Sequence, residues 1–304
     1  MTSKTHIHAI LQALLVTLIW SSSWILIKLT IEAIPPLTFA GLRYSIAILF
    51  LIPALLKNKT VIHRLTHQQW GRLILLGVFY YALTQGGQFL TLKYLETTTF
   101  SLLLNFSSVF IAILGIFFLH EKPAPLQWGG LVVFLAGVVL YFSPFTTDGG
   151  LSIGYLLAFC TVLANSISAL LGRAINREKD IPPVVTTGIS MGVGAALLLI
   201  TGLLSEDFPT ISPGNWGIIL CLASINTAFA FTLWNKTLQE LSAMESGIIN
   251  NAMLVEIALL SWIFLGDAFT IRNWVSLLIA SGGMVMVNLK SVPFKKKNPT
   301  KLRQ

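Results

Sequence analysis

The chain consists almost end to end of apolar runs that are long enough to cross a lipid bilayer. A helix needs about 20 mostly apolar residues to span the ~30 Å hydrocarbon core. We expect ten such spans, at Ile10–Leu29, Leu37–Leu56, Leu73–Thr91, Thr97–Leu119, Leu126–Phe142, Leu151–Leu171, Val184–Leu204, Trp216–Trp234, Ser246–Leu265 and Trp274–Leu289. Hydrophobic residues make up 55% of the chain and charged residues only 11%, which excludes an ordinary soluble domain. Because the alternating pattern of barrel strands is absent, the sequence predicts an all-α polytopic membrane protein.

Lysine and arginine collect in alternate connections between these spans, and this sets the expected orientation. With the N-terminus inside, the outer connections hold only Lys28, Lys93 and Arg272. Cytoplasmic loops retain basic residues, so both termini of this cell-membrane protein are predicted to be cytoplasmic. The basic tail at 291–304 is interpreted as an anchor near anionic lipid, and the net charge of +8 then requires no nucleic-acid partner.

The two halves of the chain repeat one another. A shift of 146 positions places Asn105 on Asn251 and Gly137 on Gly283 without a gap, and the tripeptide Ile-Pro-Pro at 34–36 recurs at 181–183. The sequence therefore predicts two five-helix repeats, at 1–147 and 148–290. Because five is odd, the second repeat must lie upside down relative to the first. Inverted repeats of this kind are a recurring plan of secondary transporters.

Three stretches, at 18–47, 96–130 and 227–267, resemble the EamA-type transporters of the drug/metabolite transporter superfamily. They carry a Trp-to-Lys first span, an Arg in the second, "LWNK" in the eighth and two apolar runs that end near an acid. The resemblance implies ten helices, export or exchange of metabolites, and a central cavity lined by the first, third, fourth, sixth, eighth and ninth spans. It does not name the ligand.

Two features depart from the family pattern. The second-half acid is usually Glu, where this chain has Asp267. A proline is common in the fourth and ninth spans, where this chain has Ser107 or Ser108 and Leu254. The bending of those two helices is therefore left open.

Polar and aromatic residues inside the spans are candidates for a substrate site. Trp20, Ser23 and Trp24 share one helical face, and Tyr81 shares a face with Gln85. The candidate substrate-binding residues are Trp20, Ser23, Trp24, Tyr81, Gln85, Asn105, Trp234 and Asn251. Aromatic walls with few polar groups suit a small amphipathic ligand.

Several of these residues have a structural alternative. The serine can make a tight helix contact, and a glutamine can hydrogen-bond to a neighbouring helix. Asn105 and Asn251 can form a structural hydrogen-bonding pair, and Trp234 can be an interfacial anchor.

Charged residues within or beside the spans need an explanation, because a central carboxylate costs ~2.5–3.5 kcal/mol on insertion. Glu256 is either a protonated group bonded to a neighbouring helix, or it carries a coupling proton or meets a substrate amine. Arg43 is interpreted as a gate or a structural ion pair, with carboxylate binding as the alternative. Glu121 and Asp267 lie at span ends and are interpreted as loop or cap residues.

No enzyme motif accompanies these features. A phosphate-binding Gly-rich loop, a zinc-binding His-Glu-x-x-His and a Gly-x-Ser-x-Gly elbow are all absent from the sequence, and we expect no cofactor. The sequence predicts a secondary transporter that exports small organic metabolites such as neutral or amphipathic amino acids, by alternating access. A membrane-embedded enzyme acting on lipid or peptide and a passive channel are the alternatives. The oligomeric state is open.

Overall fold

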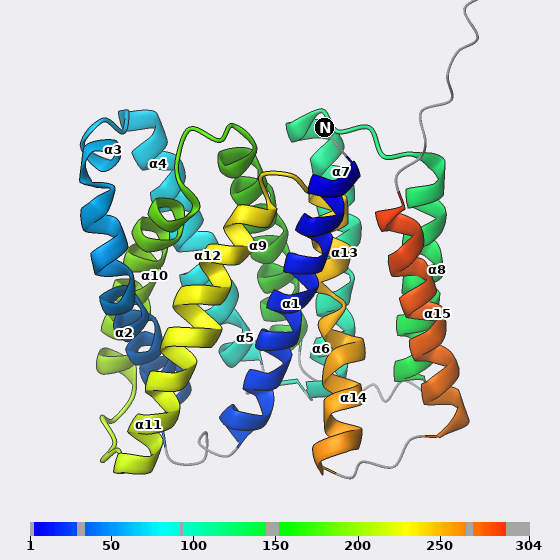
Figure 1. Cartoon of the computed structure of the whole chain (residues 1–304). Coiled ribbons are helices and arrows are strands. Elements are labelled where there is room, and N and C mark those ends of the chain that lie inside the picture. The colour runs from blue at the N-terminus through cyan, green and yellow to red at the C-terminus, as the bar shows by residue number, and fades with distance from the viewer. Residues whose placement is uncertain are drawn as a thin grey trace, which may run out of the picture.

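The computed structural model describes residues 3–28, 34–91, 94–95, 97–143, 152–265 and 270–289. Within these ranges the secondary structure is helical, and the long helices run side by side (Figure 1). The elements are α1 (Ser3–Lys28), α2 (Pro36–Lys57), α3 (Lys59–His63), α4 (His67–Leu76), η1 (Gly77–Gln85), α5 (Gly86–Thr91), α6 (Thr97–Asn105), α7 (Ser107–Leu119), α8 (Pro125–Phe142), α9 (Ser152–Arg177), α10 (Pro183–Ser205), α11 (Pro213–Cys221), η2 (Leu222–Phe229), α12 (Ala230–Thr237), α13 (Ala243–Asn250), α14 (Met253–Leu265) and α15 (Ile271–Asn288).

Eight helical stretches of the described residues are long and apolar enough to cross a membrane. They coincide with eight of the ten expected spans. The third and tenth expected spans are also helical, at His67–Thr91 and Ile271–Asn288, but they are not among these eight. Large apolar side chains such as Phe117, Phe118 and Leu278 are exposed, as expected for helices that face lipid. An all-helical polytopic membrane protein is confirmed, and the count of ten spans stays a prediction.

Helices α2 and α10 pack closely in antiparallel directions. A Cβ atom at Gly41 would lie 2.6 Å from the Cα of Leu199, and one at Gly202 would lie 2.8 Å from the backbone nitrogen of Thr38. Lipid gives apolar helices no hydrophobic reason to associate, so small residues that allow close backbone approach favour such contacts.

Helices α8 and α15 form a second antiparallel pair at one edge of the molecule (Figure 1). A Cβ atom at Gly283 would lie 2.3 Å from the backbone nitrogen of Phe134, and one at Gly137 would lie 2.5 Å from that of Ala280. Both glycines are therefore required by the distance between the two backbones.

The fourth and ninth spans are broken although neither contains the family's proline. Helix α6 ends at Asn105 and α7 begins at Ser107, while α13 ends at Asn250 and α14 begins at Met253. The Asn105 carbonyl accepts hydrogen bonds from the Ser108 hydroxyl (2.9 Å) and from Asn251 Nδ2 (2.9 Å). Side chains that satisfy a freed carbonyl can interrupt a helix as proline does, which answers the question left open by the sequence.

The third and eighth spans each contain a π-helical segment, η1 and η2. In each segment a threonine hydroxyl donates to the carbonyl five residues earlier, from Thr84 to Phe79 (2.7 Å) and from Thr227 to Leu222 (2.9 Å). Such segments are rare and are frequent at functional sites. A functional site is therefore expected among the helices around η1 and η2.

Candidate functional site

Six aromatic side chains from α1, α2, η1 and α12 meet between the helices and are called the aromatic cluster. Its members are Trp20, Tyr44, Tyr80, Tyr81, Phe231 and Trp234. The Trp20 ring lies 4.8 Å from that of Phe231 and 5.3 Å from that of Trp234, measured between centroids. The tilted and edge-on geometries are those that aromatic pairs prefer. The rings therefore connect these four elements.

The eighth span positions Trp20 through its π-helical segment. The indole Nε1 of Trp20 donates to the Asn226 carbonyl in η2 at 3.0 Å. In return, Asn226 Nδ2 donates to the Ile19 carbonyl on α1. These two bonds fix α1 against η2 and turn Trp20 toward Trp234, which lies two turns further along the same span.

Arg43 lies beside the aromatic cluster and is 9% exposed. Its Nε donates to Thr227 Oγ1 at 2.7 Å, and its Nη2 contacts the Asn226 carbonyl at 3.4 Å. The guanidinium carbon lies 5.9 Å from the centroid of the Tyr44 ring. No carboxylate of the described residues lies within ion-pair distance, so the predicted ion pair is not found in this part of the chain.

Glu256 lies on α14, on the other flank of α1. Its Oε1 accepts a hydrogen bond from the Thr17 hydroxyl at 2.8 Å, and its Oε2 accepts one from the Ser21 hydroxyl at 2.9 Å. Thr17 and Ser21 are four residues apart and so share one face of α1. The carboxylate faces protein rather than lipid, as a charged group within a membrane span requires.

The other sequence-predicted residues are placed as follows. Ser23 is buried, and its hydroxyl donates to the Trp20 carbonyl of its own helix. Gln85 is half-buried at the end of η1. Asn105 and Asn251 meet through the hydrogen bond at the two helix breaks. The helix α1 includes Trp24, whose side chain lies outside the described residues, as does Asp267.

Glu121 lies at the N-terminal end of α13, where it contacts a backbone N–H group and an arginine. Both carboxylate oxygens of Glu121 accept from the Ala243 backbone N–H, at 2.9 and 3.2 Å, and Glu121 also pairs with Arg173 Nε at 3.3 Å. Glu121 therefore caps a helix, as expected, although that helix belongs to the other half of the chain. Burial raises the pKa of the Glu121 carboxyl, and the Ala243 N–H and the Arg173 charge partly oppose this rise.

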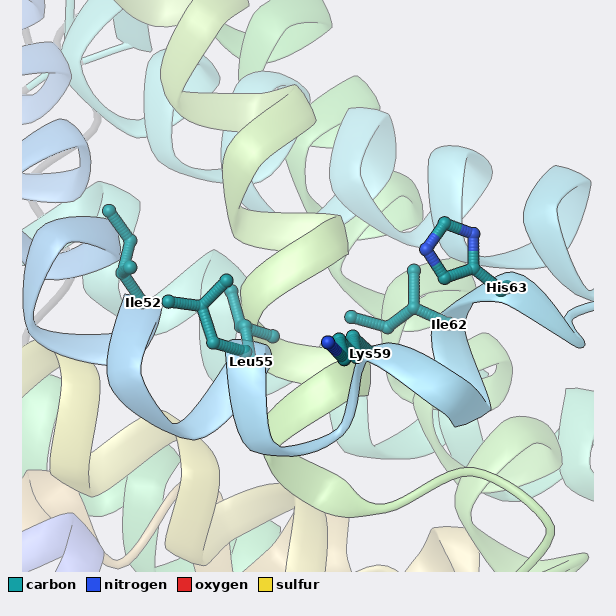
Figure 2. Close-up of a pocket in the computed structure, with 6 residues that line it drawn as sticks. Ile52, Leu55, Lys59, Ile62 and His63 are labelled. Atoms are coloured by element: carbon teal, nitrogen blue, oxygen red, sulfur yellow. The ribbon is translucent and has the colours of Figure 1, made fainter.

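A separate hollow of about 280 Å³ lies at the junction of α2 and α3 (Figure 2). It is lined by Ile52, Leu55, Leu56, Lys59, Ile62 and His63. No member of the aromatic cluster lines it, and its surface is almost wholly apolar with only two side chains that carry charge or titrate. A substrate site combines apolar and aromatic walls with a few polar groups that orient the ligand, so the aromatic cluster with the neighbouring Arg43 is the better candidate.

Sequence reasoning missed several residues of this centre. Tyr44 lies next to a residue that the sequence predicts for the site, and Phe231 lies one turn from another such residue. Asn226 and Thr227 gave no signal in the sequence, because no local residue pattern predicts a π-helical segment. The hydroxyls of Thr17 and Ser21 could have been found, since their spacing of four places both on one helical face. The second span contributes to the centre, although the resemblance did not include it among the lining helices.

Buried aromatic and charged groups held between membrane-spanning helices from both halves of the chain are typical of membrane transporters. Comparison with known proteins agrees. The EamA-like transporter family matches residues 7–143 and 152–289, and the chain belongs to this family.

Individual relatives are also transporters by name. The chain is 26% identical over 280 residues to the uncharacterized transporter YoaV of Bacillus subtilis, covering 89% of this chain and 93% of that protein. It is 26% identical over 279 residues to an S-adenosylmethionine/S-adenosylhomocysteine transporter of Chlamydia trachomatis, covering 88% and 84% of the two chains. A protein crystal structure that is 21% identical has a TM-score of 0.77 and covers 94% of this chain and 96% of that chain, which shows a shared fold.

Proposed function

We propose that this membrane transporter moves small, amphipathic organic metabolites, with neutral amino acids as the model substrates, by alternating access. The observation that carries the proposal is the buried aromatic cluster between helices of both halves, with Arg43 of α2 beside the cluster and Glu256 of α14 bonded to α1. Aromatic walls bind the apolar part of a ligand, and a few placed polar groups orient it. Export from the cytoplasm is the proposed direction, on the basis of the family resemblance.

Alternating access requires two halves that can rock against each other, and several contacts support ten spans in two inverted repeats at 1–147 and 148–290. The family matches each half separately. The pairs α2 with α10 and α8 with α15 are repeat-equivalent helices in antiparallel contact. A Cβ at Gly283 would lie 2.6 Å from the Gly130 carbonyl oxygen, and its counterpart under the shift of 146, a Cβ at Gly137, would lie 2.8 Å from the Ser276 carbonyl oxygen.

The hydrogen bond between Asn251 Nδ2 and the Asn105 carbonyl supports the same symmetry. The two asparagines are equivalent under the shift of 146, so a contact between them lies on the pseudo-twofold axis. The axis then lies in the membrane plane, as in other inverted-repeat transporters. We propose that both termini, including the tail at 291–304, are cytoplasmic, because the connections on that side carry most of the basic residues.

The relatives support the substrate class without naming the substrate of this chain. One relative is named as a transporter of S-adenosylmethionine and S-adenosylhomocysteine. Both compounds are amino-acid derivatives that carry an aromatic base. An amino-acid-like polar end with an apolar body is therefore compatible with transport in this family and with the side chains of the aromatic cluster.

Glu256 is proposed to carry the coupling proton. The Thr17 hydroxyl lies within hydrogen-bonding distance of both Glu256 Oε1 (2.8 Å) and the Leu14 carbonyl (2.9 Å), but a hydroxyl has one proton. With Glu256 ionised, Thr17 donates to the carboxylate. With Glu256 protonated, the acid donates to Thr17, which turns its own proton to Leu14. Both protonation states are thus accommodated without an unpaired polar group.

The first experiment is counterflow in proteoliposomes across a panel of neutral amino acids. Saturable counterflow is expected, because a transporter with one site exchanges labelled for unlabelled substrate. Flux that does not saturate and shows no counterflow would identify a channel. Release of a chemically altered product would identify a membrane-embedded enzyme.

The second experiment compares Glu256→Gln with the wild-type protein. The amide keeps the shape and an acceptor for one hydroxyl but cannot bind and release a proton. We expect counterflow to continue while accumulation driven by a pH gradient is lost. Glu178→Gln, which removes an exposed acid paired with Arg72, is the matched control and should behave like the wild type. Undiminished gradient-driven uptake by Glu256→Gln would reject proton coupling at this residue.

A further inference from the structure

We propose that Arg43 binds a carboxylate of the transported metabolite, which makes organic acids with an apolar or aromatic body the substrate class. The inference rests on the proposed function, since it names a ligand group for the same centre. The observation that carries it is a buried guanidinium with protein partners on one side only and an aromatic surface beside it.

A guanidinium keeps its charge in proteins and is expensive to bury without a counter-ion. Arg43 is nevertheless buried in the second span, and no carboxylate of the described residues lies within 4.0 Å of it. Glu206, at the N-terminal end of α2, accepts instead from the backbone N–H groups of Leu37 (3.2 Å) and Thr38 (2.8 Å). Glu256 is bonded to the α1 hydroxyls. These two acids are already occupied.

The partners of Arg43 position it without neutralising it. Thr227 donates its own hydroxyl proton to the Leu222 carbonyl at 2.9 Å, so its oxygen accepts from Arg43 Nε. The Asn226 carbonyl accepts both from Arg43 Nη2 and from Trp20 Nε1. Nη1 has no hydrogen-bond acceptor among the residues that the structure describes. A planar guanidinium that is held at Nε and left with donors on its terminal nitrogens suits a carboxylate, which it binds through paired hydrogen bonds.

The neighbouring side chains define the rest of the ligand. Trp20 shares the Asn226 carbonyl with Arg43, and its ring contacts Phe231 and Trp234. A ligand whose carboxylate reaches Arg43 therefore places its body against aromatic rings. This arrangement favours phenyl, indolyl or branched aliphatic acids over sugars or polyphosphates.

The test compares matched ligands on the reconstituted wild-type protein. Counterflow of phenylalanine, tryptophan, leucine and methionine is challenged with each unlabelled acid and with the corresponding amide, which lacks the carboxylate. The acids should compete at least about tenfold better than the amides, since a hydrogen-bonded charge pair contributes roughly 1.5–3 kcal/mol. 3-Phenylpropionate, which keeps the carboxylate and lacks the amine, should compete with phenylalanine.

Variants then assign the effect to Arg43. Arg43→Gln should abolish the preference for acid over amide, and Arg43→Lys should keep only part of it because an ammonium lacks the planar fork. Arg72→Gln, at an exposed ion pair with Glu178, is the matched control and should retain the full preference.

The outcomes separate this proposal from the one on which it rests. Equal competition by acids and amides in the wild type would refute carboxylate binding while counterflow upheld transport of amino-acid-like compounds. A preference for acids that persists in Arg43→Gln would refute the assignment to Arg43. An absence of counterflow with every acid and amide would refute both proposals.

Discussion

The two glycines at 282 and 283 offer a direct test of the packing between α8 and α15. A Cβ atom added at Gly283 would lie 2.3 Å from the backbone nitrogen of Phe134 and 2.6 Å from the Gly130 carbonyl oxygen. Non-bonded heavy atoms prefer separations of about 3.5–4.0 Å, so the two helices would have to move apart by ~1 Å. Since the atoms met are backbone atoms, no side-chain rotation can relieve the clash.

The expected magnitude follows from two opposing terms. Overpacking a close contact costs about 1–3 kcal/mol, and we expect the upper end here because several backbone atoms are approached. Alanine stabilises a helix by up to about 1 kcal/mol relative to glycine, which partly offsets this cost. Gly283→Ala should therefore lower the free energy of unfolding by ~2 kcal/mol.

Gly282→Ala is the matched control, because nothing lies within 4 Å of its added Cβ. This variant should be as stable as the wild type or up to ~1 kcal/mol more stable. Unfolding by SDS in mixed micelles, followed by tryptophan fluorescence, measures both. Equal stability of the two variants would show that the α8–α15 contact described here is wrong.

Three further predictions concern topology, the helix breaks and pH. In a background without native cysteines, a cysteine at the exposed position of Gly214 should react with an impermeant maleimide in sealed cells, whereas one at Lys59 should react only after permeabilisation. The reverse pattern would overturn the orientation, and labelling of both positions from the same side would overturn the inverted topology. Asn251→Ala should lower the free energy of unfolding by about 1 kcal/mol, because it removes a side-chain donor to the buried Asn105 carbonyl, and Asn250→Ala should cost less. Burial raises the pKa of the Glu121 carboxyl above its ordinary 4.5, so the native state binds the proton more tightly than the unfolded state does. The stabilisation of the native state by this proton is therefore lost as the pH rises through the native pKa. The melting temperature of the wild type relative to Glu121→Gln should therefore increase as the pH falls through the raised native pKa toward the ordinary 4.5, and a difference that does not change with pH would contradict this.

The membrane class and the helical architecture could be predicted from the sequence because both depend on local properties. The length of an apolar run decides whether it can cross the bilayer, and a helix satisfies its own backbone whatever its neighbours do. The family, which the comparison confirmed, could likewise be recognised from short stretches of residues. Asn105 and Asn251 were matched by a simple shift, and the structure brings them into contact.

The membership of the candidate site could be predicted only in part. Trp20, Tyr81 and Trp234 lie in the aromatic cluster, as residues with large rings in apolar spans often do. The Ser23 hydroxyl instead donates to a carbonyl of its own helix, and the spacing of residues on a helical face does not predict this hydrogen bond. That these residues bind substrate stays a prediction.

Tertiary structure alone decided which distant groups became partners. Trp20 and Asn226 are 206 positions apart, and Thr17 and Glu256 are 239 apart. Their hydrogen bonds depend on how whole helices are rotated and shifted against each other, which no local pattern encodes. The partners of Arg43 were likewise decided by the tertiary structure. Its sequence position shows only a charge within a span. Its two contacts form because the π-helical segment η2 presents Asn226 and Thr227 toward α2. The apolar pattern thus determined where the chain crosses the membrane, and helix packing determined which polar groups meet inside it.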